Sequence, residues 1–364
     1  MPRAADLGIR IGLLPSGPTN SVLDVPGVGL GHATVSRDEP DPPEGRGVAR
    51  TGVTVLRLAD DAFTRPIPAG GAVLNGAGEL TGLTTAREWR LLETPILLTS
   101  TMQLGRVYDA ACVLMLEEEE GVHEQVVIPV VGECDDSWLN DIRRMQVTED
   151  DVRVAWLAAK DSVGSLLPPA EGAVGSGTGM VCLGFKGGIG TASRVVPSGH
   201  TVAVLLMTNF GERDRLTVDG VPVGRLLPES VPGWVPNDEG SCIGIVVTDA
   251  PLDGADCARL ARRVGLGLAR AGSVASHGSG EIFLAAATGV RADRTGALQG
   301  TPLTGSALNP FFEAVVEASE EAVLNSMLMA TTTQGWQGRV AHALPAEPVR
   351  DLLVTAGRIP ADPA

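Results

Sequence analysis

The sequence alternates between short apolar runs that end near Gly or Pro and longer segments with the apolar spacing of helices. Runs such as 201–207 and 242–248 are apolar at successive positions, which is typical of strands buried on both faces. Strands of this kind need a sheet that is covered on both sides. The alternation therefore predicts a layered α/β protein.

Predicted strands and helices follow one another along the whole chain. The strands cover residues 72–74, 95–98, 126–131, 179–185, 193–196, 201–207, 242–248 and 282–287. The helices cover residues 78–88, 104–118, 149–162, 254–270, 309–331 and 346–356. The helix after Asp253 has the clearest period, and Gly272 stands where its C-terminal cap is expected. No fixed-period repeat and no Ser/Gly linker divides the chain, which favours a single domain over residues 1–364.

Composition argues against two classes of partner. The 28 basic and 44 acidic side chains give a net charge of −16, so nucleic acids and anionic membranes are repelled. The longest apolar runs are far shorter than the roughly 18 residues of a membrane span. Five cysteines lie far apart, and no apolar block precedes a small-residue cleavage site at the N-terminus. These features indicate a cytoplasmic protein with reduced thiols and no zinc site.

Four stretches contain residue types that carry chemistry. Residues 240–244 place a serine directly behind a glycine at the start of an apolar strand, which by itself is typical of an ordinary loop-to-strand junction. Residues 172–190 are rich in glycine but match no nucleotide-binding motif, so tight turns explain them better than phosphate binding. Residues 276–281 contain Ser, His and Glu but no G-x-S-x-G elbow, and His277 is expected in a turn. Residues 132–141 lack the calcium-loop pattern. Their carboxylates beside an aromatic residue could instead hold a cationic group of a substrate.

A long series of motifs goes beyond these local patterns. They include Asp-Val-Pro-Gly-Val at 24–28, Val-Leu-Asn-Gly-Ala-Gly-Glu-Leu-Thr-Gly at 73–82, Pro-Val-Val-Gly-Glu at 129–133 and Leu-Asn-Asp-Ile at 139–142, and they continue through 172–196, 209–211, 240–251, 278–284 and 320–345. Together the motifs resemble those of the L-aminopeptidase/D-esterase and β-aminopeptidase family of self-processing serine peptidases. The resemblance implies a four-layer α/β/β/α sandwich, similar to N-terminal-nucleophile hydrolases but differently connected.

The resemblance also implies that the precursor cuts its own Gly240–Ser241 bond. The products are an α chain of residues 1–240 and a β chain of residues 241–364 that stay associated. Ser241 Oγ can attack the carbonyl of Gly240, and a glycine permits backbone strain and close approach there. Cleavage frees the α-amino group of Ser241, which titrates at about 7.7 to 8.0 and can act as a base. One residue then supplies both nucleophile and base.

The other site residues follow from the same resemblance. Ser279 is expected to relay protons, and Glu281 to orient it or to stabilise the ammonium of Ser241. Their spacing of two places both side chains on one face of a strand. Asn209 is expected to donate its amide to the oxyanion, a contact whose loss costs about 2.7 to 4 kcal/mol. Glu133 is expected to receive the free amino group of the substrate.

Two further residues are candidates for substrate binding, each with an alternative interpretation. Asn75 stands in a family motif, but Asn-Gly is also an ordinary turn pair. Trp138 is expected either to line the acyl pocket or to belong to the core.

The expected function is that of an aminopeptidase or amidase whose nucleophile is Ser241. It removes N-terminal residues from small peptides, amides or esters, and no metal or organic cofactor is expected. Members of the family form homo-oligomers, so a homo-oligomer is expected here. Two alternatives stay open: acyl transfer to an amine, as in the distantly similar ornithine acetyltransferases, which use a threonine in place of Ser241, and a Gly-rich binding protein that never cuts itself.

Overall fold

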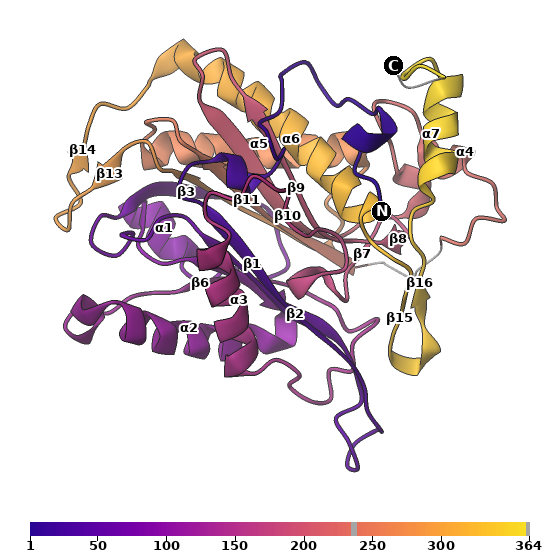
Figure 1. Cartoon of the computed structure of the whole chain (residues 1–364), viewed down its shortest axis with the longest axis horizontal. Helices are drawn as coiled ribbons and strands as arrows, with labels where there is room; N and C mark the ends of the chain where they lie inside the picture. Colours follow the sequence, from indigo (N-terminus) through magenta and orange to yellow (C-terminus); the bar gives the residue numbers. More distant parts are fainter. Residues whose placement is uncertain (234–238, 362–364) are drawn as a thin grey trace.

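The computed structural model describes residues 1–233 and 239–361. They form two mixed β-sheets, one of four strands and one of six, with helices on the outer side of each (Figure 1). The smaller sheet has the order β1-β2-β5-β6 and contains β1 (Gly29–Asp38), β2 (Val48–Arg57), β5 (Ile96–Ser100) and β6 (Val130–Cys134). The larger has the order β4-β3-β12-β11-β10-β9 and contains β4 (Leu91–Leu92), β3 (Ile67–Gly76), β12 (Gly278–Ala287), β11 (Glu239–Thr248), β10 (Thr201–Asn209) and β9 (Gly188–Val195).

Helices form the two outer layers. The smaller sheet packs against α2 (Leu104–Glu118) and α3 (Glu149–Asp161), and the larger sheet against α5 (Gly254–Ala271) and α6 (Asn309–Leu328). The remaining α-helices are α1 (Leu83–Trp89), α4 (Val223–Leu226) and α7 (Ala346–Thr355). Short strand pairs are β7 (Val181–Cys182) with β8 (Phe185–Lys186), β13 (Arg291–Ala292) with β14 (Leu298–Gln299), and β15 (Thr333–Gln334) with β16 (Val340–Ala341).

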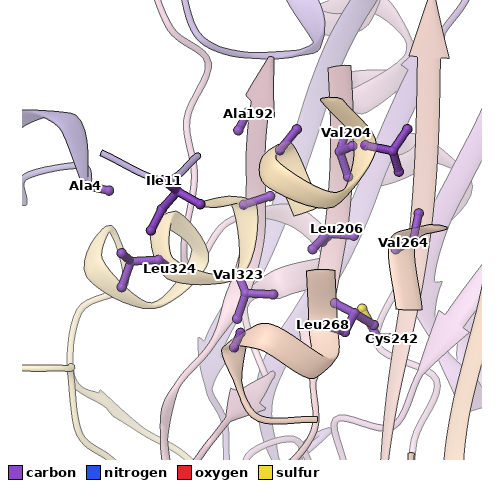
Figure 2. Packing of buried hydrophobic residues seen from close by; sticks show 14 of the residues in the cluster. Ala4, Ile11, Ala192, Val204, Leu206, Cys242, Val264, Leu268, Val323 and Leu324 are labelled. Atoms are coloured by element: carbon purple, nitrogen blue, oxygen red, sulfur yellow. The ribbon is translucent and has the colours of Figure 1, made fainter. Parts of the chain in front are cut away.

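The larger sheet is buried on both faces, as its apolar strands predict. Val204 and Leu206 of β10 point to the helical side, where they meet Val264 of α5 and Val323 of α6 (Figure 2). The alternate residues of β10, among them Leu205, point to the smaller sheet. This alternation follows from the two-residue period of a strand. The expected four-layer α/β/β/α sandwich is thereby confirmed.

Three predicted elements differ from the structure. The strand expected at 126–131 is wrong, because β6 starts only at Val130 and Val126 is 87% exposed. The strand expected at 179–185 is the hairpin β7–β8, whose turn places Leu183 and Gly184 at φ 48° and 77°. The helix expected from residue 78 starts at Leu83, because the preceding residues bond to β6.

Other expectations agree with the structure. Helices α2, α3, α5, α6 and α7 start where the sequence predicts them. Gly272 is the C-cap of α5, and its N–H donates to the carbonyl of Leu268 at 3.1 Å. All five cysteines are free. Within residues 1–233 and 239–361, no helix combines the length and hydropathy needed to cross a bilayer.

Candidate active site

The candidate catalytic residues meet at one end of the larger sheet. Ser241 of β11 lies opposite Asn209 of β10 and opposite Gly280 of β12. Glu281, next to Gly280, lies opposite Asn75 of β3. Four adjacent strands thus bring together residues that are far apart in the sequence.

Ser241 points into the layer between the two sheets. It shares a strand face with Ile243 and Ile245, which pack in that layer. The residue is 5% exposed, its Oγ has no nitrogen or oxygen partner among the described residues, and the Cys134 thiol of β6 lies beside it. Buried hydroxyls without a partner also occur at Thr51, Thr94, Ser100 and Ser319, so it is the position of Ser241 directly after Gly240 that distinguishes it as the candidate nucleophile.

Gly240 is required for space rather than for backbone strain. Its φ does not lie in the left-handed region, and it forms part of β11 opposite Ser279. A Cβ at this position would lie 2.9 Å from the carbonyl oxygen of Asn209 and 3.0 Å from Phe210 Cα. The expectation of a strained glycine is therefore wrong. The expectation that close approach requires a glycine fits the structure.

Asn209 is held in one orientation by two hydrogen bonds. Its Oδ1 accepts from the backbone N–H of Val181 at 2.9 Å, and its Nδ2 donates to the carbonyl of Asp135 at 2.8 Å. Because a backbone N–H can only donate, the amide oxygen must face Val181 and the NH₂ group must face away from it. One hydrogen of Nδ2 is left for an oxyanion.

Ser279 and Glu281 point together to the helical side of the sheet. Ser279 Oγ donates to the Glu281 carboxylate, so the expected shared face is confirmed. They alternate with residues such as Ile282, which packs between the sheets, and they line a small cavity with Gly240. The pair therefore lies next to the backbone of the Gly240–Ser241 bond, where cleavage would leave the new amino group. It lies on the helical face of the sheet, whereas the Ser241 side chain points to the other face.

The electrostatics of Glu281 follow from its burial. Burial raises the pKa of this carboxyl, and the hydrogen bond from Ser279 acts in the opposite direction. Its Oε2 has no hydrogen-bond partner among the described residues. A carboxylate with a free oxygen beside a new amino group is suited to accept a hydrogen bond from an ammonium.

Glu133 approaches the site from β6 of the other sheet. The residue is 4% exposed, its Oε1 accepts from the backbone N–H of Glu79 at 2.7 Å, and its Oε2 accepts from Thr101 Oγ1. Gly78 lies between Glu133 and β12, the strand next to Ser241. A Cβ on Gly78 would lie 3.1 Å from Glu133 Oε1 and 3.6 Å from Gly280 Cα, so the close approach of Glu133 to this strand depends on a glycine. Burial raises the pKa of Glu133, against the two hydrogen bonds.

Asn75 and Trp138 lie around this centre in different ways. Asn75 belongs to β3 rather than to a turn, and its Nδ2 donates to the carbonyls of Ser276, at 2.8 Å, and Ser279. It therefore fixes the start of β12. Trp138 packs against a cluster that includes Val181, the residue that orients Asn209. The roles of Asn75 and Trp138 in substrate binding stay predictions.

Sequence reasoning missed three contributors to the site. Thr101 binds Glu133, Gly78 makes room beside it, and the carbonyl of Asp135 holds Asn209. Gly78 lies inside the motif at 73–82, which is the one signal that could have found it. Within the described part of the chain, no group of His, Cys, Asp or Glu is arranged to hold a metal ion.

Comparisons with known proteins agree with this arrangement. The pattern of Peptidase family S58 matches residues 20–341. β-Peptidyl aminopeptidase BapA of Sphingosinicella microcystinivorans is 36% identical over an alignment of 382 positions, gaps included, which covers 99% of this chain and 94% of that protein.

Two solved structures superpose on almost the whole chain. The β-aminopeptidase of Burkholderia sp. is 39% identical with a TM-score of 0.85, and 100% of each chain is covered. The L-aminopeptidase D-Ala-esterase/amidase of Ochrobactrum anthropi, a prototype of the serine aminopeptidases, is 35% identical with a TM-score of 0.89. That match covers 99% of this chain and 100% of the other, whose fold is a variant of the Ntn hydrolase fold.

Proposed function

The chain belongs to peptidase family S58 and is a serine aminopeptidase, and from this premise we propose that it cleaves its own Gly240–Ser241 bond and then uses Ser241 as its nucleophile. The observation that carries the proposal is the position of Ser241. It lies directly after Gly240 and opposite Asn209, and no nitrogen or oxygen atom of the described residues engages its buried Oγ. Family membership excludes the alternative of a binding protein without enzymatic activity.

Self-cleavage is an acyl shift followed by hydrolysis. Ser241 Oγ attacks the carbonyl carbon of Gly240, and the hydroxyl proton passes to the nitrogen of Ser241 as the peptide bond breaks. Gly240 is then held as an ester on Oγ. Water hydrolyses that ester, which leaves a carboxylate on Gly240, a free hydroxyl on Ser241 and a new α-amino group.

Turnover of a substrate uses the same hydroxyl. The Glu133 carboxylate binds the substrate ammonium, and the Ser241 amino group takes the Oγ proton as Oγ attacks the substrate carbonyl. The free Nδ2 hydrogen of Asn209 stabilises the oxyanion. The Ser279–Glu281 pair stabilises the protonated amino group until that proton passes to the leaving amine. Water then releases the acyl group from Ser241.

The proposed substrates are short peptides and amides with a free amino terminus. Two of the relatives above are named for β-peptides or β-amino substrates, and we extend this preference to the chain. The test is a panel of p-nitroanilides of glycine, L-alanine, D-alanine and a β-amino acid. The β-amino substrate should have the highest kcat/KM, whereas a clear preference for L-alanine would refute the extension. Product analysis with an added amine separates hydrolysis from acyl transfer.

The test of the nucleophile is Ser241→Ala, with Ser198→Ala as control. Ser198 is an exposed serine in the turn between β9 and β10, at the other end of the strand that carries Asn209. Wild type and Ser198→Ala should give two chains with a mass ratio of roughly 2:1, the smaller beginning at Ser241. Ser241→Ala should stay one chain and be inactive. Cleavage of that variant between residues 240 and 241, or its turnover of substrate, would show that the nucleophile is misassigned.

A further inference from the structure

Lys186 of β8 is enclosed by backbone carbonyls and is 0% exposed. Its Nζ donates to the carbonyls of Gly177 at 3.0 Å, Met180 at 2.7 Å and Gly187 at 2.8 Å. An ammonium has three hydrogens and no lone pair, whereas a neutral amine would turn its lone pair toward a carbonyl oxygen. The three acceptors therefore match the charged form of the side chain.

One of these carbonyls connects Lys186 to the oxyanion donor. The Met180 carbonyl and the Val181 N–H belong to the same peptide group, and that N–H donates to Asn209 Oδ1 at 2.9 Å. An unbroken series of hydrogen bonds thus runs from the ammonium through one peptide group to the amide whose Nδ2 hydrogen is free. Hydrogen bonds in series polarise one another, and a charge at one end strengthens the donor at the other.

We propose that Lys186 is a positioning residue for acyl transfer, and that it orients and polarises the 180–181 peptide so that Asn209 is a stronger oxyanion donor. This inference rests on the function proposed above for Asn209. Lys186 touches neither substrate nor reacting atoms. Because negative charge develops on the oxyanion only as the reaction proceeds, stronger donation from Asn209 raises kcat rather than substrate affinity.

A purely structural role for Lys186 would be to pair these carbonyls. The carbonyls of Gly177 and Met180 already accept from backbone N–H groups, of Met180 at 3.2 Å and of Gly187 at 3.1 Å, so they do not require a buried charge, which costs free energy. The same burial lowers the pKa of Lys186 to about 7. The ammonium is therefore lost as the pH rises above about 7, and with it the polarisation of Asn209.

The titratable groups packed around Lys186 do not replace this charge. Burial raises the pKa of the neighbouring Cys182 thiol to about 12, so the thiol stays neutral. Burial also raises the pKa of Asp136, which packs against the glycine-rich segment, to about 7. The Arg213 guanidinium lies over the ring of Phe185, and the backbone carbonyl of His342 accepts from the backbone N–H of Lys186 at 2.7 Å.

The first test compares Lys186→Met with Lys160→Met. Lys160 is the other lysine of the chain, half exposed and paired with Glu118 at 2.9 Å. Rates are divided by the amount of self-cleaved chain, measured by intact mass. Lys186→Met should lower kcat about tenfold at pH 7 with KM unchanged within twofold, because the donor is weakened but not removed. Lys160→Met should behave as wild type. An unchanged kcat in Lys186→Met would overturn the inference.

A double-mutant cycle separates action through Asn209 from a general loss of order. Asn209→Ala alone should lower kcat by about 10²- to 10³-fold. If Lys186 acts through Asn209, adding Lys186→Met to that variant changes kcat by less than twofold. If the two effects multiply, Lys186 acts independently of Asn209 and the inference is wrong.

The pH profile is a readout that remains if the Lys186→Met variant does not fold. The α-amino group of Ser241 titrates in wild type and in Lys186→Arg alike, so its effect cancels in the ratio of their kcat values. Because arginine keeps its charge, the kcat of Lys186→Arg divided by that of wild type should rise above pH of about 7. A ratio that stays constant up to pH 9 would overturn the inference. The outcomes also separate the two proposals. Activity in Ser241→Ala refutes the proposed function, whereas an inactive Ser241→Ala with a fully active Lys186→Met refutes only the role of Lys186.

Discussion

Replacement of Glu133 by glutamine tests how the enzyme recognises an amino terminus. The change removes the negative charge but keeps an amide oxygen that can still accept from the Glu79 N–H. Hydrogen bonds to charged groups contribute about 1.5 to 3 kcal/mol. Loss of one partner of a buried ion pair costs about 3 to 5 kcal/mol. Glu133 is 4% exposed, so we take about 2 to 4 kcal/mol, centred on the value of about 3 at which these two ranges meet.

A cost of this size predicts a fall in kcat/KM of about 30- to 1,000-fold, since each 1.4 kcal/mol corresponds to tenfold. The assay compares β-alanine p-nitroanilide with propionyl p-nitroanilide, which lacks the amino group. Glu133→Gln should lose activity only on the first substrate. Glu79→Gln is the matched control, because Glu79 is exposed and contacts Glu133 through its backbone N–H. An equal loss on both substrates would show that Glu133 has only a structural role.

Stability gives an independent check on the same variant. Burial raises the pKa of Glu133 above its ordinary value, so the folded state binds this proton more tightly than the unfolded state does. The resulting stabilisation is present at low pH and is lost as the pH rises through the folded pKa. At pH 7 the ionised carboxylate is therefore a cost that glutamine avoids, and the melting temperature of Glu133→Gln should not fall. A large fall in the melting temperature would show that Glu133→Gln loses activity because it misfolds.

Two further predictions concern self-cleavage and the core. Gly240→Ala should slow precursor cleavage about tenfold or more, because its Cβ would lie 2.9 Å from the Asn209 carbonyl oxygen; a precursor half-life on denaturing gels equal to that of wild type would contradict this. Trp156→Ala should lower the free energy of unfolding by about 3 to 5 kcal/mol, because this large side chain of α3 is 1% exposed and packs in the core between α3 and the smaller sheet. Urea denaturation measures that loss, and a change below about 1 kcal/mol would refute the packing argument.

Helix starts could be predicted because their signals are local. Thr148 caps α3 by accepting from the N–H of Asp151, and Asp253 caps α5 by accepting from the N–H of Asp256. Both caps lie within three residues of the groups that they bind, so they are visible in the sequence.

Strand limits were less predictable because they depend on a partner. The apolar run 126–131 predicted a strand over its whole length. Pro129 has no N–H to donate to a neighbouring strand, however, and the pairing with β5 begins only at Val130. The strand then continues through Glu133, a polar residue that an apolar pattern does not assign to a strand. Only the pairing of Thr99 with Glu133 in the assembled sheet explains its position.

The sequence predicted which residues belong to the site better than it predicted how they are arranged. Residue types and family motifs singled out Ser241, Asn209, Ser279 and Glu281, and the structure brings them to one end of the larger sheet. Their faces depend on the parallel register of β11 and β12, which puts Gly280 rather than Ser279 opposite Ser241. A shift of one residue would reverse these faces, and no local pattern determines such a register.

The contacts of Lys186 were invisible for a similar reason. In the sequence it is one basic residue in a Gly-rich stretch. Its three carbonyl acceptors come from residues between 177 and 187 that are brought together only by the hairpin β7–β8.

The central claim is that Ser241 becomes a chain terminus and then carries the acyl group. The most direct measurement is an intact mass spectrum of protein quenched during turnover of an ester substrate, followed by peptide mapping. The account predicts a 241–364 chain heavier by one acyl group, with the added mass on Ser241. An adduct on another residue, or turnover by an unbroken chain of 364 residues, would contradict it.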